Sequence, residues 1–150
     1  MGKAAKKLFA IVGMPGAGKS EVVHILEEKG LPFVRFGEET DKGLTSAGLP
    51  LTEENEREYR EKLRLKLGME VYAIKAEPKI IQLLEKYDMV IIDGLYSWEE
   101  YTYLKKDFPE LALICVYAEP PMRYARLARR PIRPLSDFEA RKRDIDEIEK

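Results

Sequence analysis

The apolar residues of this chain fall into short unbroken runs that alternate with longer, more polar stretches of helical spacing. The runs at 8–12, 89–92 and 111–117 are typical of strands that are buried on both faces. A further run at 31–37 predicts a short strand with Pro32 at its edge, because proline cannot donate a hydrogen bond within a sheet. The pattern therefore predicts four strands.

Helices are predicted between and after these strands, over 21–30, 52–73, 78–86, 98–108, 120–130 and 137–150. Thr52 is a typical N-cap residue, and Ser136 with Glu139 forms a capping box. Gly68 is a weak point inside the second of these helices, and Pro78 suits the first turn of the third. The polar, glycine-bearing segment 38–50 is expected to be a loop or a broken helix.

Strands that alternate with helices predict an α/β protein in which a parallel sheet carries helices on both faces. The crossovers between its strands should be right-handed. A length of 150 residues suits a single domain with a substantial core. We therefore expect residues 1–150 to form one three-layer α/β/α domain.

The first predicted strand leads into a glycine-rich loop that fits the pattern G-x-x-x-x-G-K-S at every fixed position. Its residues are Gly13, Met14, Pro15, Gly16, Ala17, Gly18, Lys19 and Ser20. Such a loop curls so that its N–H groups and the positive end of the next helix face an anion. Lys19 supplies a cation for the phosphates, and Ser20 supplies a hydroxyl for Mg²⁺. The alternative is a glycine-rich turn without a ligand, but the strand–loop–helix context favours nucleotide binding.

The third predicted strand ends at Asp93, and ligands bind at this end of a parallel sheet. A metal ion or its coordinated water is a suitable partner for a carboxylate in that position. The other interpretation is a turn or N-cap aspartate that precedes Gly94.

Basic residues are concentrated near the end of the chain, where seven arginines and one lysine accompany three acidic residues between Glu119 and Arg143. Two helices separated by Pro131–Pro134 would bring these cations together, which favours a phosphate ligand because like charges otherwise repel. Arginines can also stabilise a phosphoryl group during transfer. The alternative is a solvated basic face paired with Glu139, Asp144 and Asp146.

Composition narrows the function classes. The net charge of −1 provides no overall field for nucleic acid, and no apolar run approaches the roughly 18 residues of a membrane span. The basic N-terminus is not followed by the apolar core of a signal peptide, so we expect a cytoplasmic protein with neither nucleic acid nor membrane as its main partner. A high charged fraction of 35% with few side-chain amides is the pattern of hyperthermophilic proteins.

The chain contains one cysteine and one histidine. A single cysteine excludes an intrachain disulfide and a zinc site built from cysteines. Cys115 lies within an apolar run and is expected to be a buried structural thiol. His24 lies within a predicted helix and is expected to be a packed or surface residue, not a catalytic one.

Together these motifs resemble the nucleoside-monophosphate kinase superfamily of P-loop kinases, which includes dephospho-coenzyme A kinase, and within it a family of archaeal kinase-like proteins. The resemblance extends from Phe9 to the C-terminus. Besides the phosphate loop, it rests on FGEET at 36–40, LTEEN at 51–55, LRLKLGMEVYA at 63–73, VIIDG at 90–94 and the arginine-rich segment that ends at Arg143-Asp144.

The resemblance implies a core at about 8–36 and 87–120, an acceptor-binding helical segment at about 37–76 and a lid at about 121–143, with ATP and Mg²⁺ as cofactors. Besides the loop residues, it implies nucleotide contacts for Arg126, Arg130 and Arg141. The implied acceptor contacts are Gly37, Glu38, Arg64, Asp93 and Tyr96. Catalysis is assigned to Lys19, Asp93, Arg126 and Arg130, and the metal to Ser20 and Asp93.

Three features depart from the adenylate kinases. Tyr96 and Ser97 stand where Pro-Arg is expected, and Asp41 stands where the acceptor segment usually ends in arginine. No apolar run follows the arginine-rich segment, so we expect the C-terminal strand of such kinases to be missing.

The sequence therefore predicts a small-molecule kinase that transfers the γ-phosphoryl group of ATP to a nucleoside, a nucleotide or a dephospho-coenzyme A-like acceptor. Two alternatives stay open: a P-loop ATPase or nucleotide-dependent switch without an acceptor, and a protein that binds nucleotide without turnover. The arginine-rich segment favours transfer, whereas the missing acceptor arginines favour the alternatives. The sequence makes no prediction of the oligomeric state.

Overall fold

A computed structural model describes residues 6–149 of the chain. Its strands are β1 (Lys7–Val12), β2 (Phe33–Arg35), β3 (Met89–Asp93) and β4 (Ala112–Cys115). Its helices are α1 (Lys19–Glu28), α2 (Glu38–Ser46), α3 (Glu53–Leu67), α4 (Val71–Lys86), α5 (Trp98–Asp107), α6 (Pro120–Ala128) and α7 (Asp137–Ile148). The alternation of strands and helices agrees with the predicted α/β class.

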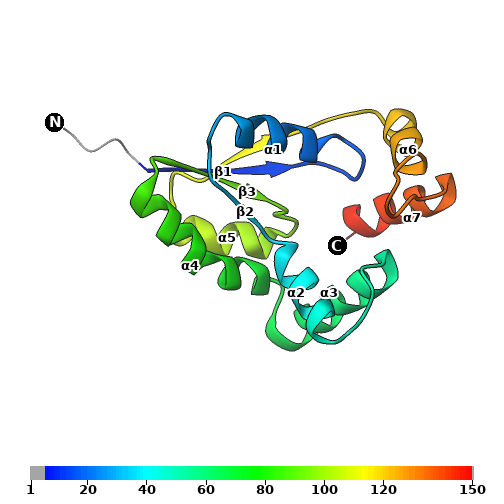
Figure 1. The fold of residues 1–150 in the computed structure, drawn as a ribbon, viewed down its shortest axis with the longest axis horizontal. Coiled ribbons are helices and arrows are strands. Elements are labelled where there is room, and N and C mark those ends of the chain that lie inside the picture. Colours follow the sequence, from blue (N-terminus) through cyan, green and yellow to red (C-terminus); the bar gives the residue numbers. More distant parts are fainter. Residues whose placement is uncertain (1–5, 150) are drawn as a thin grey trace.

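The strands form one parallel sheet in the order β2-β3-β1-β4 (Figure 1). Ala10 of β1 pairs with Ile92 of β3, and Arg35 of β2 pairs with Asp93. All four strands therefore end at the same edge of the sheet, and the loop after β1 lies beside Asp93 at that edge.

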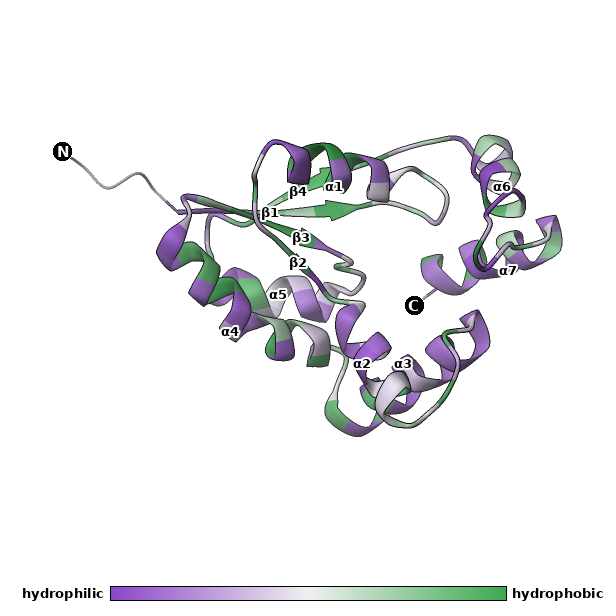
Figure 2. Cartoon of the chain, in the orientation of Figure 1, coloured by the Kyte–Doolittle hydropathy of each residue, from purple (hydrophilic) through white to green (hydrophobic). Residues whose placement is uncertain are grey.

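Helices cover both faces of this sheet, as α1 lies on one side and α4 with α5 on the other (Figure 1). The larger core lies between the sheet and α4 and α5, where Ile80, Ile92 and Leu104 are fully buried. A smaller core joins Ile11 and Ile91 to Val23 of α1. Figure 2 shows the apolar strands between helices that carry both polar and apolar residues. The predicted three-layer arrangement is confirmed.

Two pairs of helices extend beyond the carboxyl ends of the strands and face each other (Figure 1). After the segments expected from the sequence, we call α2 with α3 the acceptor lobe and α6 with α7 the lid, and the acceptor and lid roles stay predictions. The lid has its own small core of Leu127, Leu135 and Ala140. Both expected N-caps are present, because Thr52 Oγ1 accepts from the Asn55 N–H at 3.2 Å and Ser136 forms a capping box with Glu139.

The predicted helix boundary at Pro78 is wrong. α3 ends at Gly68, whose φ of 99° lies in a region that favours glycine, and α4 then runs through Pro78. α4 buries Ala76 and Ile80 against the sheet, and this burial outweighs the backbone hydrogen bond that the proline removes. The segment 38–50, expected as a loop or a broken helix, forms the regular helix α2 over Glu38–Ser46.

The expectation that Cys115 is buried is also wrong, because its side chain is exposed. β4 pairs with β1 on one side and is the last strand of the described sheet, so that all of Ala112–Cys115 is exposed. Leu111, just before β4, is buried. The apolar run was a correct indicator of a strand, but it could not reveal that this strand lies at the edge of the sheet.

Candidate functional site

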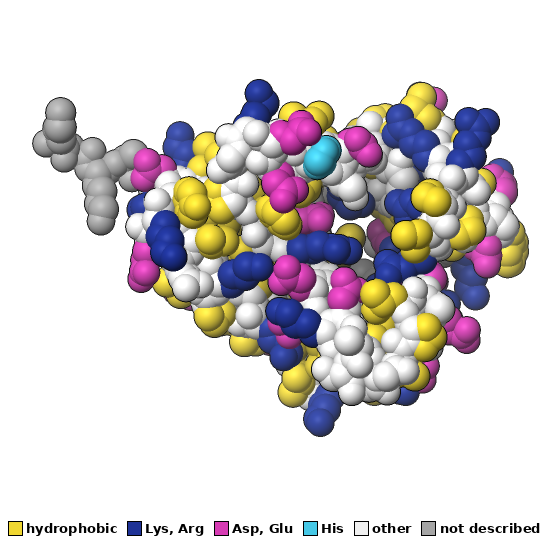
Figure 3. Space-filling model, in the orientation of Figure 1, with side chains coloured by type: hydrophobic (Ala, Val, Ile, Leu, Met, Phe, Trp, Pro, Cys, Tyr) yellow, Lys and Arg dark blue, Asp and Glu magenta, His cyan; other side chains and the backbone are white. Residues whose placement is uncertain are grey.

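A cavity of about 1130 Å³ opens at the carboxyl ends of the strands, between the acceptor lobe and the lid. Figure 3 shows this face hollowed between the two lobes, with basic and acidic side chains around the opening. The phosphate loop, the end of β3, the acceptor lobe and the lid all contribute to its lining. The cavity therefore brings together segments that lie far apart in the sequence.

The phosphate loop needs its glycines for backbone conformation and for close packing. Gly13, Gly16 and Gly18 have φ values of 147°, 78° and 107°. A Cβ atom at Gly16 would lie 2.7 Å from the Arg123 carbonyl oxygen, and one at Gly13 would clash with the Val116 carbonyl oxygen. α1 begins directly after Gly18 and has no side-chain cap, so its first N–H groups can bind an anion.

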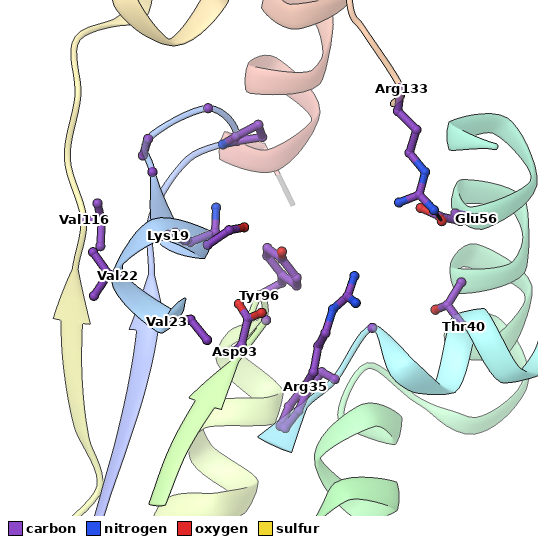
Figure 4. Close-up of a pocket in the computed structure, with 18 of the residues that line it drawn as sticks. Lys19, Val22, Val23, Arg35, Thr40, Glu56, Asp93, Tyr96, Val116 and Arg133 are labelled. Carbon is purple, nitrogen blue, oxygen red and sulfur yellow. Dashed lines mark ion pairs between the residues drawn. The ribbon is translucent and has the colours of Figure 1, made fainter. Parts of the chain in front are cut away.

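Lys19 extends over this loop, where its Nζ donates to the carbonyl oxygens of Gly13 at 2.5 Å and Met14 at 3.2 Å. Burial lowers the pKa of its ammonium group, because the charged form loses hydration. Nζ also lies 5.9 Å from the centre of the Tyr96 ring. Figure 4 shows Lys19, Asp93 and Tyr96 converging on the same part of the cavity.

Asp93 ends β3 and lines the cavity next to the loop and Lys19 (Figure 4). Burial raises the pKa of its carboxyl group, and the positive charges of Arg35 and Lys19 oppose this effect. No cluster of three His, Cys, Asp or Glu side chains that could hold a metal ion occurs within residues 6–149. A hydroxyl from Ser20 and a carboxylate from Asp93 on one cavity fit Mg²⁺, which prefers oxygen ligands and usually keeps several from water and phosphate.

Arg123 links the loop to the lid, and the sequence analysis assigned it no role. Its side chain is buried and donates to the Pro15 carbonyl oxygen at 3.0 Å and to both carboxylate oxygens of Asp144 at 2.8 and 2.5 Å. Its partners lie 108 and 21 positions away in the sequence, so no local motif marks it.

One of the predicted lid arginines contacts the loop, and a second lines the cavity. Arg126 Nη1 donates to the carbonyl oxygens of Gly16 at 3.3 Å and Ala17 at 3.2 Å. Arg130 also lines the cavity, and burial, assisted by the nearby Arg143, lowers the pKa of its guanidinium group. Arg141 does not reach the cavity lining, since it forms an ion pair with Asp137 at 2.9 Å on the other side of the lid.

The lid contacts the acceptor lobe through two ion pairs that sequence reasoning missed. Arg133 pairs with Glu56 of α3, whose side chain is buried, and Figure 4 shows the two side chains in direct contact. Arg143 pairs with Glu53 at 2.8 Å. Arg60 lies 3.8 Å from both of these glutamates. These contacts join the lid to α3 on the side of the cavity away from the sheet.

Most predicted acceptor residues line the cavity, namely Gly37, Arg64, Asp93 and Tyr96. Glu38 is not among the lining residues, because its carboxylate pairs with Lys79 at 3.2 Å and Lys42 at 3.6 Å on the outer side of α2. His24 is an exposed residue, as one of the two expectations had it, and lies 3.3 Å from Glu28.

Glu100 fixes the loop that carries Tyr96. Its fully buried carboxylate accepts the backbone N–H groups of Tyr96 at 2.8 Å and Ser97 at 3.1 Å, and it pairs with Arg64 at 3.2 Å. Sequence reasoning missed this residue, although the Ser97–Glu100 spacing of a capping box was a local signal.

Comparisons of sequence place this chain among known proteins. A family model described as "AAA domain" matches residues 10–145. A "UPF0200 protein" from Thermococcus onnurineus is 36% identical over 125 residues, which are 82% of this chain and 68% of that protein. A "UPF0200 protein" from Thermococcus sibiricus is 35% identical over 140 residues, 89% of this chain and 74% of that protein. These relatives agree with the predicted archaeal and thermophilic affinity.

Comparisons of structure show the same fold in solved proteins that include two kinases. A protein from Thermus thermophilus, TT1252, has a TM-score of 0.59 at 18% identity and covers 97% of this chain and 83% of its own. A shikimate kinase from Bacteroides thetaiotaomicron has a TM-score of 0.53 at 14% identity, covering 95% and 78%. A gluconokinase from Sinorhizobium meliloti has a TM-score of 0.52 at 16% identity, covering 97% and 76%.

Within residues 6–149 no helix is long and apolar enough to cross a membrane. The phosphate loop, the parallel sheet and the lid form a P-loop kinase-like domain, and the sequence matches extend through almost all of it. The chain therefore belongs to the AAA domain family and to the UPF0200 proteins.

Proposed function

We propose that this protein is a small-molecule kinase that transfers the γ-phosphoryl group of ATP to a hydroxyl group of its acceptor. The observation that carries the proposal is a single cavity lined at one end by the phosphate loop and at the other by the acceptor lobe, with Asp93 between them. A donor on the loop and an acceptor on the lobe would then meet beside Asp93. Bringing the two reactants together in this way is the main source of catalysis in phosphoryl transfer.

The reaction forms a bond between the acceptor oxygen and the γ-phosphorus and breaks the bond between that phosphorus and the bridging oxygen. ADP leaves with the electron pair of the broken bond, and the proton of the acceptor hydroxyl is released to water. Lys19, Arg126 and Arg130 neutralise charge on the phosphate oxygens. Mg²⁺, held by Ser20 and Asp93 when bound, supplies further charge neutralisation at the phosphates.

The lid favours transfer to an acceptor over hydrolysis. Its ion pairs with the acceptor lobe, Arg133 to Glu56 and Arg143 to Glu53, hold it across the cavity and limit the access of water. Arg123 couples this lid to the loop through the Pro15 carbonyl oxygen. Gly37, Arg64 and Tyr96 are the proposed acceptor contacts, and a cytoplasmic location stays a prediction.

The experiment that tests this proposal measures ADP release from ATP and Mg²⁺ with a panel of nucleosides, nucleotides, polyols and dephospho-coenzyme A. A kinase releases ADP in proportion to the acceptor that is present. ADP release that no acceptor changes would instead identify an ATPase or a nucleotide-dependent switch.

A further inference from the structure

Within the described residues, the cations at the loop end of the cavity form no ion pair with a carboxylate within 4.0 Å. Lys19 and Arg126 donate to backbone carbonyl oxygens of the loop. No ion pair of Lys19, Arg126 or Arg130 with a carboxylate is found in the described part of the chain. Their charges are therefore available to an anionic ligand, which the triphosphate of ATP would be.

The arginines at the acceptor end differ, because each of them lies within 4.0 Å of a carboxylate. Arg35 is 3.8 Å from Asp41, and Arg64 is 3.2 Å from Glu100. Arg60 lies between Glu53 and Glu56, at 3.8 Å from each. These carboxylates line the same cavity as the arginines that they neutralise.

Arg64 cannot leave its partner without a large penalty. Glu100 is 0% exposed, and Arg64 is its only charged partner within the described residues. If a phosphate drew Arg64 away, the carboxylate would keep two backbone N–H donors but no compensating charge, which is unfavourable in a buried site. Arg64 also lies over the Tyr72 ring at 5.5 Å, and Thr40 fixes the Tyr72 hydroxyl at 2.7 Å.

Two lid arginines that reach this end of the cavity are paired as well. Arg133 and Arg143 pair with Glu56 and Glu53, so they offset the acidic residues of α3. At the acceptor end, three lining arginines stand beside four lining carboxylates, which are Asp41, Glu53, Glu56 and Glu100, and Asp93 lies between the two ends. With the two lid arginines and Asp93 included, five arginines stand beside five carboxylates.

We propose, on the basis of the kinase function proposed above, that the acceptor is an uncharged compound with several hydroxyl groups and not a phosphomonoester. A diol can donate to the Asp41 carboxylate and accept from the Arg35 guanidinium without breaking any ion pair. A phosphate in the same place would meet carboxylates that are already committed to the arginines, and it would have to displace them.

The test compares matched acceptors that differ only in a phosphate, such as a nucleoside with its 5′-monophosphate and a hexitol with its phosphate ester. ADP release stimulated by each acceptor is measured with saturating ATP and Mg²⁺. The uncharged member of the preferred pair should have a kcat/KM at least about 10-fold higher than its phosphorylated form. A higher kcat/KM for a phosphorylated member would overturn the inference while leaving the kinase function intact.

Two variants separate the role of charge from that of folding. Asp41→Asn removes the partner of Arg35 and should lower the KM of the phosphorylated acceptor by about 5-fold or more, with little change in kcat. Asp107→Asn replaces an exposed carboxylate at the end of α5 and should leave the preference for the uncharged acceptor as it is in the wild type. Equal preference in wild type and Asp41→Asn would contradict the assigned role of the Arg35–Asp41 pair.

A binding measurement tests the same proposal without turnover, and it therefore applies even if the panel lacks the natural acceptor. The protein is saturated with a non-hydrolysable ATP analogue, which occupies the loop, and inorganic phosphate is added as the probe. Phosphate at about 1 mM should not raise the melting temperature of the wild type beyond that of a chloride control, whereas it should stabilise Asp41→Asn. Stabilisation of the wild type by phosphate under these conditions would overturn the inference.

Discussion

Burial shifts the pKa values of two residues that line the same part of the cavity. It lowers the pKa of Lys19 and raises the pKa of Asp93, since each charged form has lost part of its hydration. The opposite charges of Lys19 and Asp93 oppose these pKa shifts only in part, because burial is the largest effect on the pKa of both residues. The residues that are proposed to bind phosphate and metal are therefore a source of instability in the free protein.

Asp93→Asn should consequently make the folded protein more stable while it abolishes turnover. The raised pKa means that ionised Asp93 destabilises the folded state, and this cost appears as the pH rises through the unfolded-state value of about 3.9 and is complete above the folded-state pKa. At pH 7 we therefore expect a higher melting temperature for Asp93→Asn than for the wild type. Thermal unfolding followed by circular dichroism measures it.

The same difference should disappear below about pH 4, where Asp93 is protonated in the wild type as well. Asp107→Asn, which replaces an exposed aspartate, serves as the control and should have almost no effect. A lower melting temperature of Asp93→Asn at pH 7 would show that Asp93 stabilises the free protein, contrary to this account.

Cys115 offers a residue-scale test of the sheet edge. Because its thiol is exposed at β4, it should react with an aromatic disulfide reagent in the folded protein within minutes and at one equivalent per chain. The absorbance of the released thiolate at neutral pH measures the rate, with urea-unfolded protein as the reference for full reactivity. Reaction only after unfolding would mean that the side chain is buried, as the sequence alone had suggested.

The sequence predicted the roles of some single residues and not of others. The phosphate loop was identified because its function requires residue types at fixed, local spacing. Arg123 and Glu56 escaped notice because their roles depend on contacts with distant segments, the carbonyl oxygen of Pro15 and the guanidinium of Arg133. Arg141 and Glu38 matched a family pattern, but in this chain Asp137 and Lys79 hold them away from the cavity lining.

At the scale of elements, α4 shows how tertiary burial overrides local signals. Pro78 is an exposed residue in the interior of α4, where it removes one backbone hydrogen bond of the helix. Pro78→Ala should therefore stabilise the protein by about 1–3 kcal/mol. Urea unfolding measures the free energy, with Gln82→Ala, an exposed position four residues further along α4, as the control.

The higher stability of Pro78→Ala should appear as a higher urea concentration at the midpoint of unfolding, without a change in the dependence of the free energy on urea. Destabilisation by Pro78→Ala would indicate that the helix requires the proline at this position, and that the lost hydrogen bond is not a net cost. The control should change stability by no more than about 0.5 kcal/mol.

At the scale of the whole molecule, the three-layer architecture could be predicted from the alternation of strands and helices along the sequence. Four runs of apolar residues gave the parallel sheet, and the glycine-rich loop located the edge at which ligands bind. The position of each strand within the sheet depends on tertiary packing. The way the lid meets the acceptor lobe depends on side-chain contacts such as Arg143 with Glu53. Contacts of this kind have no periodicity, so hydrophobic patterns cannot predict them.

The central claim is that the cavity transfers phosphate from ATP to an acceptor, and transfer of label from [γ-³²P]ATP tests it most directly. With Mg²⁺ and the best acceptor of the panel, the wild type should place the label on the acceptor. Lys19→Ala should reduce this rate by at least about 100-fold, the scale of losing one charge-stabilising group at a transition state. Lys29→Ala, an exposed lysine at the end of α1, is the matched control and should retain the wild-type rate. Label that appears only as inorganic phosphate at a rate independent of any acceptor, or undiminished transfer by Lys19→Ala, would contradict the account.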